Sequence, residues 1–226
     1  MTNLLPQNFP AVPPEALATL TFTDLVNGNG ILTLYGATHE EAGTTSYYLT
    51  TNQIYSNTVL TSGSTVQSAT PVKILDKNFD VTFQRPIDFK GYAHLNVTYG
   101  GYATSGTGTL KMFISGASLQ NATTSQTLVT ASGAILTFVN NDSTQSLISN
   151  MQFDLTGGPY HFSRGQVFRL NLPLWGVSSA ASSAISYPGF GHDPKERDDP
   201  DPNRLSVSGG HTTQMALYLP VFLDIS

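Results

Sequence analysis

A strict alternation of apolar and polar side chains recurs along most of this 226-residue chain. In FDVTF (79–83), the three apolar residues share one face of an extended segment, while Asp80 and Thr82 lie on the other. The alternation continues through AHLNVTY (93–99), LKMFI (110–114), MQFDL (151–155), VFRLNLPLW (167–175) and QMALYLPVFLDI (214–225). A period of two places one face of a strand in the core and the other outside it. Because no segment keeps the period of about 3.6 residues typical of a helix, the sequence predicts strands throughout.

Clusters of Gly, Ser, Asn and Pro separate these segments at roughly the 8–12-residue spacing that all-β domains show. We therefore expect an all-β fold, an antiparallel β-sandwich of jelly-roll type, formed as a single domain by residues 17–226. Residues 1–16 contain Pro6, Pro10, Pro13 and Pro14. Proline fixes φ and removes a backbone donor, so this stretch is predicted to be an extended N-terminal arm.

Two sets of apolar residues are predicted to contact other subunits. Leu4, Leu5 and Phe9 are interleaved with the prolines of the arm, which either docks on a neighbouring subunit or lies on its own domain. In the last strand, Tyr218 and Phe222 occupy the second face, with Pro220 between them. A strand that is apolar on both faces is either central in a two-layer stack or covered by another subunit. Since proline favours an edge or a bulge over a fully bonded central position, we expect a subunit interface here.

Composition excludes several classes of partner. Charged residues make up 11% of the chain, against a usual value of about 25%. The net charge is −5, and the few Lys and Arg form no basic stripe that would neutralise phosphates, so no nucleic-acid partner is expected. No apolar run approaches the roughly 20 residues of a membrane span, so no membrane partner is expected. The N-terminal residues lack the basic and apolar regions of a secretory leader, which predicts a protein made and kept in a cytoplasm.

One loop departs from this low charge. The stretch GHDPKERDDPDPNRL (191–205) holds eight of the 25 charged residues, 10 basic and 15 acidic. Asp199, Asp201 and Asn203 have the spacing that opens a calcium-binding loop. However, Arg204 stands where such a loop needs glycine, and Gly210 stands where a glutamate would close it. We therefore expect no metal and no cofactor, and interpret the segment as a proline-stiffened loop whose acids and bases neutralise one another.

No catalytic signature is present. The chain has no cysteine, and it lacks the G-x-S-x-G elbow, the P-loop and the dinucleotide fingerprint. We therefore expect a protein that is not an enzyme. The tyrosines and the tryptophan have two interpretations. Either they form an exposed platform on which sugars stack, or they fill the core and its turns. The residues concerned are Tyr47, Tyr48, Tyr55, Tyr92, Tyr99, Tyr102, Tyr160 and Trp175.

Four stretches resemble small all-β virion proteins of tailed, marine-type bacteriophages. They are FTDLVNGNGILTLYG, KILDKNFDVTFQRPIDFKGYAHLNV, FSRGQVFRLNLPLW, and the ending GHDPKERDDPDPNRL with TTQMALYLPVF. The resemblance implies a non-enzymatic capsid-associated or head-decoration protein, assembled in the host cytoplasm and located in the virion. Its partners would be copies of itself, as a homo-oligomer, and other capsid or virion proteins. We expect a trimer, which matches the local threefold positions of an icosahedral shell. The alternative is a glycan- or receptor-binding β-sandwich module, such as a tail-fibre tip or a carbohydrate-binding domain.

Calcium is expected to leave the melting temperature of the protein unchanged, because the loop lacks the glutamate that would close a calcium site. Thermal unfolding with calcium and with a chelator measures this. A rise of several degrees with calcium would show that Asp199, Asp201 and Asn203 are ligands after all.

Overall fold

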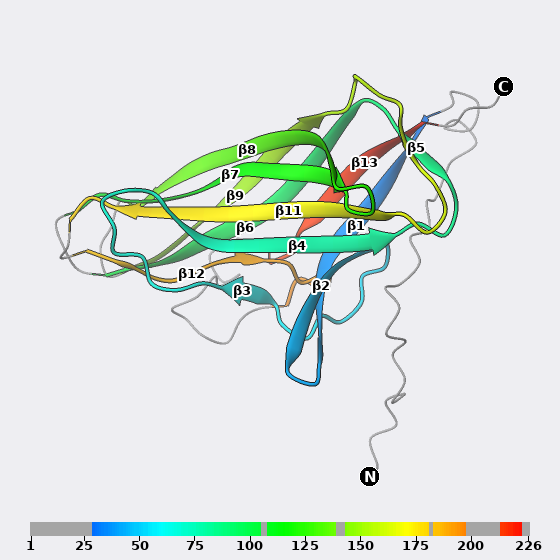
Figure 1. Ribbon diagram of the computed structural model, residues 1–226. Helices are drawn as coiled ribbons and strands as arrows, with labels where there is room; N and C mark the ends of the chain where they lie inside the picture. Colours follow the sequence, from blue (N-terminus) through cyan, green and yellow to red (C-terminus); the bar gives the residue numbers. More distant parts are fainter. Residues whose placement is uncertain (1–28, 105–107, 139–142, 181–182, 198–212, 223–226) are drawn as a thin grey trace, which may run out of the picture.

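The computed structural model describes residues 29–104, 108–138, 143–180, 183–197 and 213–222 (Figure 1). The predicted all-β class is confirmed, because the described residues form strands and turns and contain no helix. Leu4, Leu5 and Phe9 of the arm, and Asp199, Asp201 and Asn203 of the charged loop, lie outside the described residues. The strands are β1 (Asn29–Glu41), β2 (Thr44–Thr50), β3 (Leu60–Ser62), β4 (Val72–Thr82), β5 (Ile87–Phe89), β6 (Tyr92–Ala103), β7 (Leu110–Asn121), β8 (Gln126–Phe138), β9 (Ser143–Asp154), β10 (Tyr160–Phe162), β11 (Val167–Ser178), β12 (Ile185–Gly191) and β13 (Ala216–Phe222).

The strands are joined in one continuous sheet with the order β3-β12-β6-β13-β1-β2-β4-β11-β7-β8, and β9 pairs with the remaining edge of β6. Their pairing is antiparallel except between β2 and β4, which meet in parallel at Tyr48 and Asp80. Strand β1 pairs with a different strand along each half of its length. Residues 29–35 pair with β13 and residues 35–41 pair with β2, so β1 connects two limbs of the sheet. The all-β and antiparallel parts of the prediction therefore hold, while the jelly-roll topology stays a prediction.

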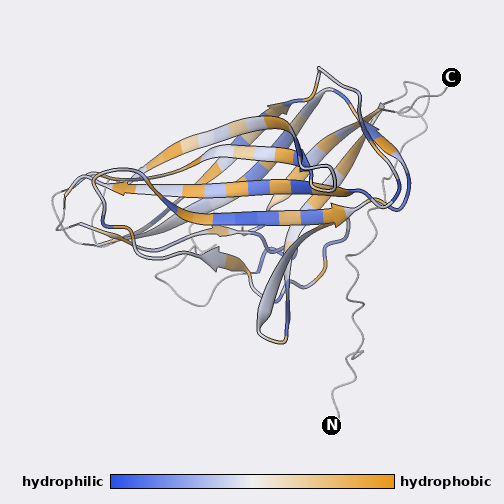
Figure 2. Ribbon diagram, viewed as in Figure 1, coloured by the Kyte–Doolittle hydropathy of each residue, from blue (hydrophilic) through white to orange (hydrophobic). Residues whose placement is uncertain are grey.

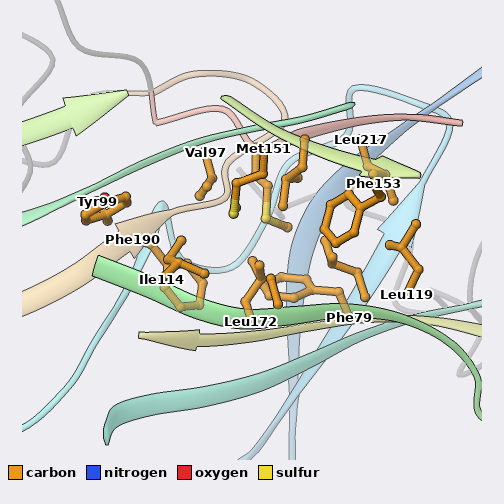
Figure 3. Close-up of a cluster of buried hydrophobic side chains, with 14 of the residues drawn as sticks. Phe79, Val97, Tyr99, Ile114, Leu119, Met151, Phe153, Leu172, Phe190 and Leu217 are labelled. Atoms are coloured by element: carbon orange, nitrogen blue, oxygen red, sulfur yellow. The ribbon is translucent and has the colours of Figure 1, made fainter. Parts of the chain in front are cut away.

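The two limbs face each other across one core. Figure 3 shows Phe79 of β4, Leu119 of β7 and Leu172 of β11 directed toward Met151 and Phe153 of β9. All five side chains are buried. The alternation in FDVTF is borne out, because its three apolar residues are buried while Asp80 and Thr82 are only partly buried. We call the two halves the β4–β11–β7–β8 limb and the β9–β6–β13–β1 limb.

Strand β13 is not at an edge, so of the two positions expected for Pro220, an edge or a bulge, the edge is wrong. One side of β13 pairs with β1, and the other pairs with β6 and then with β5. Pro220 lies where this second partner turns from β5 into β6, at Lys90 and Gly91. The Lys90 amide donates to the Pro220 carbonyl at 3.3 Å. Because the second ladder is interrupted at this point, the missing proline N–H removes no ladder bond.

The far strands of the two limbs, β8 and β9, meet through side chains instead of a backbone ladder. The buried Tyr99 of β6 reaches across the core and donates its hydroxyl to the Ala134 carbonyl of β8. The Ala134 amide donates to Ser149 Oγ of β9 at 3.2 Å. A side chain at Gly133 would collide with Ser149, since its Cβ would lie 2.7 Å from that Oγ. Burial raises the pKa of Tyr99 to about 12, with a smaller opposing effect from Ser149, so its hydroxyl stays a donor at neutral pH.

Replacing Tyr99 by phenylalanine is expected to lower the free energy of unfolding by about 1 kcal/mol, because the Ala134 carbonyl loses its donor. Urea denaturation at neutral pH measures this. Tyr92→Phe, which removes an exposed hydroxyl, is the control and is expected to change little. Equal stability of Tyr99→Phe and the parent protein would show that this bond does not hold the two limbs together.

Candidate functional site

The two limbs present outer faces of different chemistry. Residues 29–35 of β1, all of β6 and all of β13 contain no Asp, Glu, Lys or Arg, and β9 contains only Asp154. Large apolar side chains stand exposed here, with Ile31 at 63%, Tyr92 at 51% and Ile148 at 45% exposure. We call this outer surface of β1, β13, β6 and β9 the uncharged face. It consists of Ile31, Thr33, Tyr92, His94, Asn96, Ile148, Asn150, Gln152, Tyr218 and Phe222.

Tyr218 and Phe222 both belong to this face. Their neighbours Leu217, Leu219 and Val221 are buried, so the two aromatic rings point away from the core, as the alternation predicted. Tyr218 lies opposite Thr33 on one side and His94 on the other. Phe222 is partly covered by the Lys90 ammonium, which lies 5.7 Å from the ring centroid. Neither residue is fully exposed, and both stay predicted interface residues.

The outer face of the other limb carries charge in paired form. Arg169 donates two hydrogen bonds to the carboxylate of Asp80, each at 2.7 Å. Lys73 and Asp76 form a second pair at 2.7 Å. Burial alone would raise the pKa of Asp76, but hydrogen bonds from Lys73 and Asn171 outweigh it and hold that pKa below its usual value. Figure 2 shows the hydrophilic residues of this limb along the middle of β4 and β11.

The start of the charged loop is a turn held by an ion pair between a buried aspartate and a partly exposed arginine. Asp193 is fully buried, and its two carboxylate oxygens accept from the Arg197 guanidinium at 3.0 and 3.1 Å. The guanidinium also donates to the Ser56 carbonyl and lies 5.3 Å from the ring centroid of Tyr55. Thr213 also holds this turn, because its carbonyl accepts a hydrogen bond from the Asp193 amide and its hydroxyl donates one to the Arg197 carbonyl. Arg197 therefore neutralises Asp193 at the start of the loop, while the expected neutralisation of the charges in 198–205 concerns residues outside the described part.

His192, beside this pair, is a core residue that sequence reasoning missed. A hydrogen bond of 2.9 Å joins its Nε2 to Thr61 Oγ1, and its ring packs against Phe79, Phe190 and Tyr47. Its Nδ1 has no hydrogen-bond partner among the described residues. Burial lowers the pKa of His192 to about 4, although the nearby Asp193 carboxylate acts in the opposite direction. The residues next to His192 in the sequence did not predict its burial, because the residues that bury it come from β2, β3 and β4.

Asp88 of β5, His161 of β10 and Ser163, which follows β10, form a hydrogen-bonded chain in the order aspartate, histidine, serine, as in a hydrolase triad. His161 Nδ1 lies 2.7 Å from Asp88 Oδ1, and His161 Nε2 lies 3.3 Å from Ser163 Oγ. The His161 side chain is 58% exposed, so water competes for both of its nitrogens. The neighbouring amides of Ser163 and Gly165 are already used, by Gln166 Oε1 and the Phe83 carbonyl. Because these amides cannot also stabilise an oxyanion, we interpret the trio as a surface hydrogen-bond chain.

The described residues offer neither a metal cluster nor a membrane span. No group of three or more His, Asp or Glu side chains converges within them. None of their segments forms a helix long and apolar enough to cross a bilayer.

Comparison with known proteins gives no family. No family model matches the chain, and no curated protein matches it. Two solved structures of a CocE/NonD family hydrolase from Staphylococcus aureus are distantly similar. The first is 8% identical with a TM-score of 0.26, covering 84% of this chain and 40% of the hydrolase chain. The second is 7% identical with a TM-score of 0.19, covering 84% and 41%. The chain thus spans about 40% of the hydrolase length, and likeness at this level carries no argument about activity.

Acidification is expected to destabilise the protein through His192. Its pKa is about 4 when folded, against an ordinary value of 6.5, so the unfolded chain binds the proton more readily. The stability that depends on neutral His192 is present above pH 6.5 and is lost as pH falls toward 4. Between pH 7 and pH 5 this linkage amounts to about 2 kcal/mol. Urea denaturation at both pH values measures it.

The variant His192→Gln is expected to lose that pH dependence, whatever its stability at neutral pH, because glutamine does not titrate in this range. His39→Gln, a change at a more exposed histidine of β1, is the control and should retain it. The same fall in stability in His192→Gln as in the parent protein would assign the acid sensitivity to other groups.

Proposed function

We propose that this protein is a non-enzymatic structural component of a virus particle that self-associates through the uncharged face. The observation that carries this proposal is the charge asymmetry between the two outer faces. Strands β6 and β13 and residues 29–35 of β1 contain no charged residue, and β9 contains only Asp154, while the opposite face carries paired Lys, Arg and Asp side chains. Asp88 and Lys90 lie beside Phe222, at one end of the uncharged face. Charged residues are depleted at the centres of protein interfaces, where aromatic residues are enriched.

A second copy of the chain is the partner that fits this face best. Water-exposed apolar side chains such as Ile31, Tyr92 and Ile148 are spread over one continuous sheet surface. Monomeric proteins seldom leave apolar patches larger than a few hundred Å² uncovered. The polar residues among them are Asn, Gln, Thr and His, which both donate and accept hydrogen bonds. Such a surface can contact a neighbouring copy in a ring without placing like charges together.

The virion setting rests on the resemblance of the sequence to phage virion proteins. It supports a capsid-associated or head-decoration role, with a trimer as the expected assembly. A closed ring buries the same patch in every copy, and it leaves the charged face of the opposite limb available to solvent. Mass spectrometry of purified virions from the source phage tests the location, since a virion component must be found in the particles.

Tyr218→Asp is expected to convert the assembly into a monomer. The substitution places an unpaired carboxylate in the interface, which costs several kcal/mol and weakens self-association by about a hundredfold or more. Light scattering coupled to gel filtration at micromolar concentration gives the mass of each variant. Thr130→Asp adds the same charge on β8, in the opposite limb, and should leave the mass unchanged. A wild-type protein that is monomeric under these conditions would overturn the proposal.

A further inference from the structure

The outer face of the β4–β11–β7–β8 limb carries a row of four large side chains, two of them aromatic, that crosses four strands. Lys73, Trp175, Phe113 and Ile135 are successive cross-strand partners on β4, β11, β7 and β8. The residues next to Trp175, Phe113 and Ile135 along their strands, Leu174, Ile114 and Leu136, are buried, and Lys73 itself is exposed, so the row lies on the outer surface. Ile135 is 60% exposed, and the Lys73 ammonium lies 5.7 Å from the centroid of the Trp175 ring. Trp175 is the only tryptophan in the chain.

A network of hydrogen-bonding groups adjoins the tryptophan. Lys73 Nζ lies 2.7 Å from Asp76 Oδ2, so the same ammonium contacts the indole and the carboxylate. Asn171 Nδ2 donates to Asp76 Oδ1 at 2.6 Å and to Asn78 Oδ1 at 2.8 Å. Asp76 and Asn78 are exposed, and Lys73 is exposed as well. Donors and acceptors therefore stand side by side at the surface, next to an aromatic ring.

The indole ring is held in place before any ligand arrives. Trp175 Nε1 donates to the Ser115 carbonyl at 3.3 Å, which fixes the orientation of the ring on the sheet. A group that is already oriented loses less conformational entropy on binding. The carboxylate of Asp76 is similarly fixed by Lys73 and Asn171.

We infer that this surface binds a neutral saccharide, with Trp175 as the platform and Lys73, Asp76 and Asn78 as hydroxyl partners. A sugar ring presents an apolar C–H face, which suits the face of an indole, and a rim of hydroxyl groups that donate and accept hydrogen bonds. Lys73 is paired with Asp76, and Arg169 is paired with Asp80, so the charges along β4 and β11 neutralise one another. Lys111 of β7, two residues from Phe113 on the same face, adds a further ammonium that can donate to a sugar hydroxyl. Hexose and N-acetylhexosamine oligosaccharides are the ligand class that this chemistry favours.

The inference goes beyond the proposed structural function and uses the opposite surface. Because the two limbs enclose one core, their outer faces point away from each other. An assembly that buries the uncharged face therefore leaves Trp175 outward. Several copies held in one particle would then present several saccharide sites together, which raises the avidity of weak binding.

An array of neutral hexose and N-acetylhexosamine oligosaccharides, probed with the biotinylated protein on streptavidin, tests the inference. Binding sugars are then titrated in solution while tryptophan emission is followed, and the single tryptophan makes the signal specific to this site. A saturable change in emission is expected. By calorimetry, Trp175→Ala should weaken binding at least tenfold, and Asp76→Ala, a change at an exposed residue that spares the core, should weaken it severalfold.

Two controls separate this inference from the proposed function. Tyr92→Ala, on the uncharged face, should leave saccharide binding unchanged, and Tyr218→Asp should bind the sugar as a monomer. Trp175→Ala should keep the oligomeric mass of the parent protein. An array without any bound saccharide would overturn the inference, and so would a saccharide whose affinity is the same in the parent, Trp175→Ala and Asp76→Ala proteins.

Discussion

Burial of one face of each limb in a shared core is the constraint on which the rest of this structure depends. Strand β1 makes it possible, because its first half pairs with β13 and its second half pairs with β2. The sheet can then fold over, so that Phe79 of β4 meets Phe190 of β12 with ring centroids 6.1 Å apart. At the far strands of the two limbs, Tyr99 and Ser149 bridge the limbs through Ala134 without a ladder. Side-chain packing, more than backbone pairing, thus keeps the limbs together.

Folding over one core gives the protein two outer faces that serve different chemistry. Strand alternation sends Tyr218 and Phe222 out of one limb, and Trp175 and Phe113 out of the other. The first face is nearly free of charge and suits contact with another copy, while the second carries paired charges and amides beside an indole. The same strand geometry therefore leaves room for the proposed assembly on one side and the proposed saccharide binding on the other, without either surface disturbing the core.

The charged loop gains its stability from the fold that surrounds its base. The buried carboxylate of Asp193 is neutralised by Arg197, and removal of Arg197 would leave that buried charge unpaired. His192 is adjacent and stays neutral because Phe79, Phe190 and Tyr47 exclude water from its ring. The first residues of the most charged segment of the sequence are thus anchored in the apolar core.

The sequence by itself determined the strand content and the inward or outward direction of side chains. A period of two is a local property, which is why the burial of 79–83 and the outward direction of Tyr218 and Phe222 followed from the residues alone. The central position of β13 did not follow, because Pro220 is tolerated only where β5 turns into β6, more than a hundred residues earlier. The burial of His192 did not follow from the residues alone, and neither did the proximity of Trp175 to Lys73, Asp76 and Phe113. These depend on which strands become neighbours, and in a sheet this is decided by tertiary packing of segments that lie far apart in the chain.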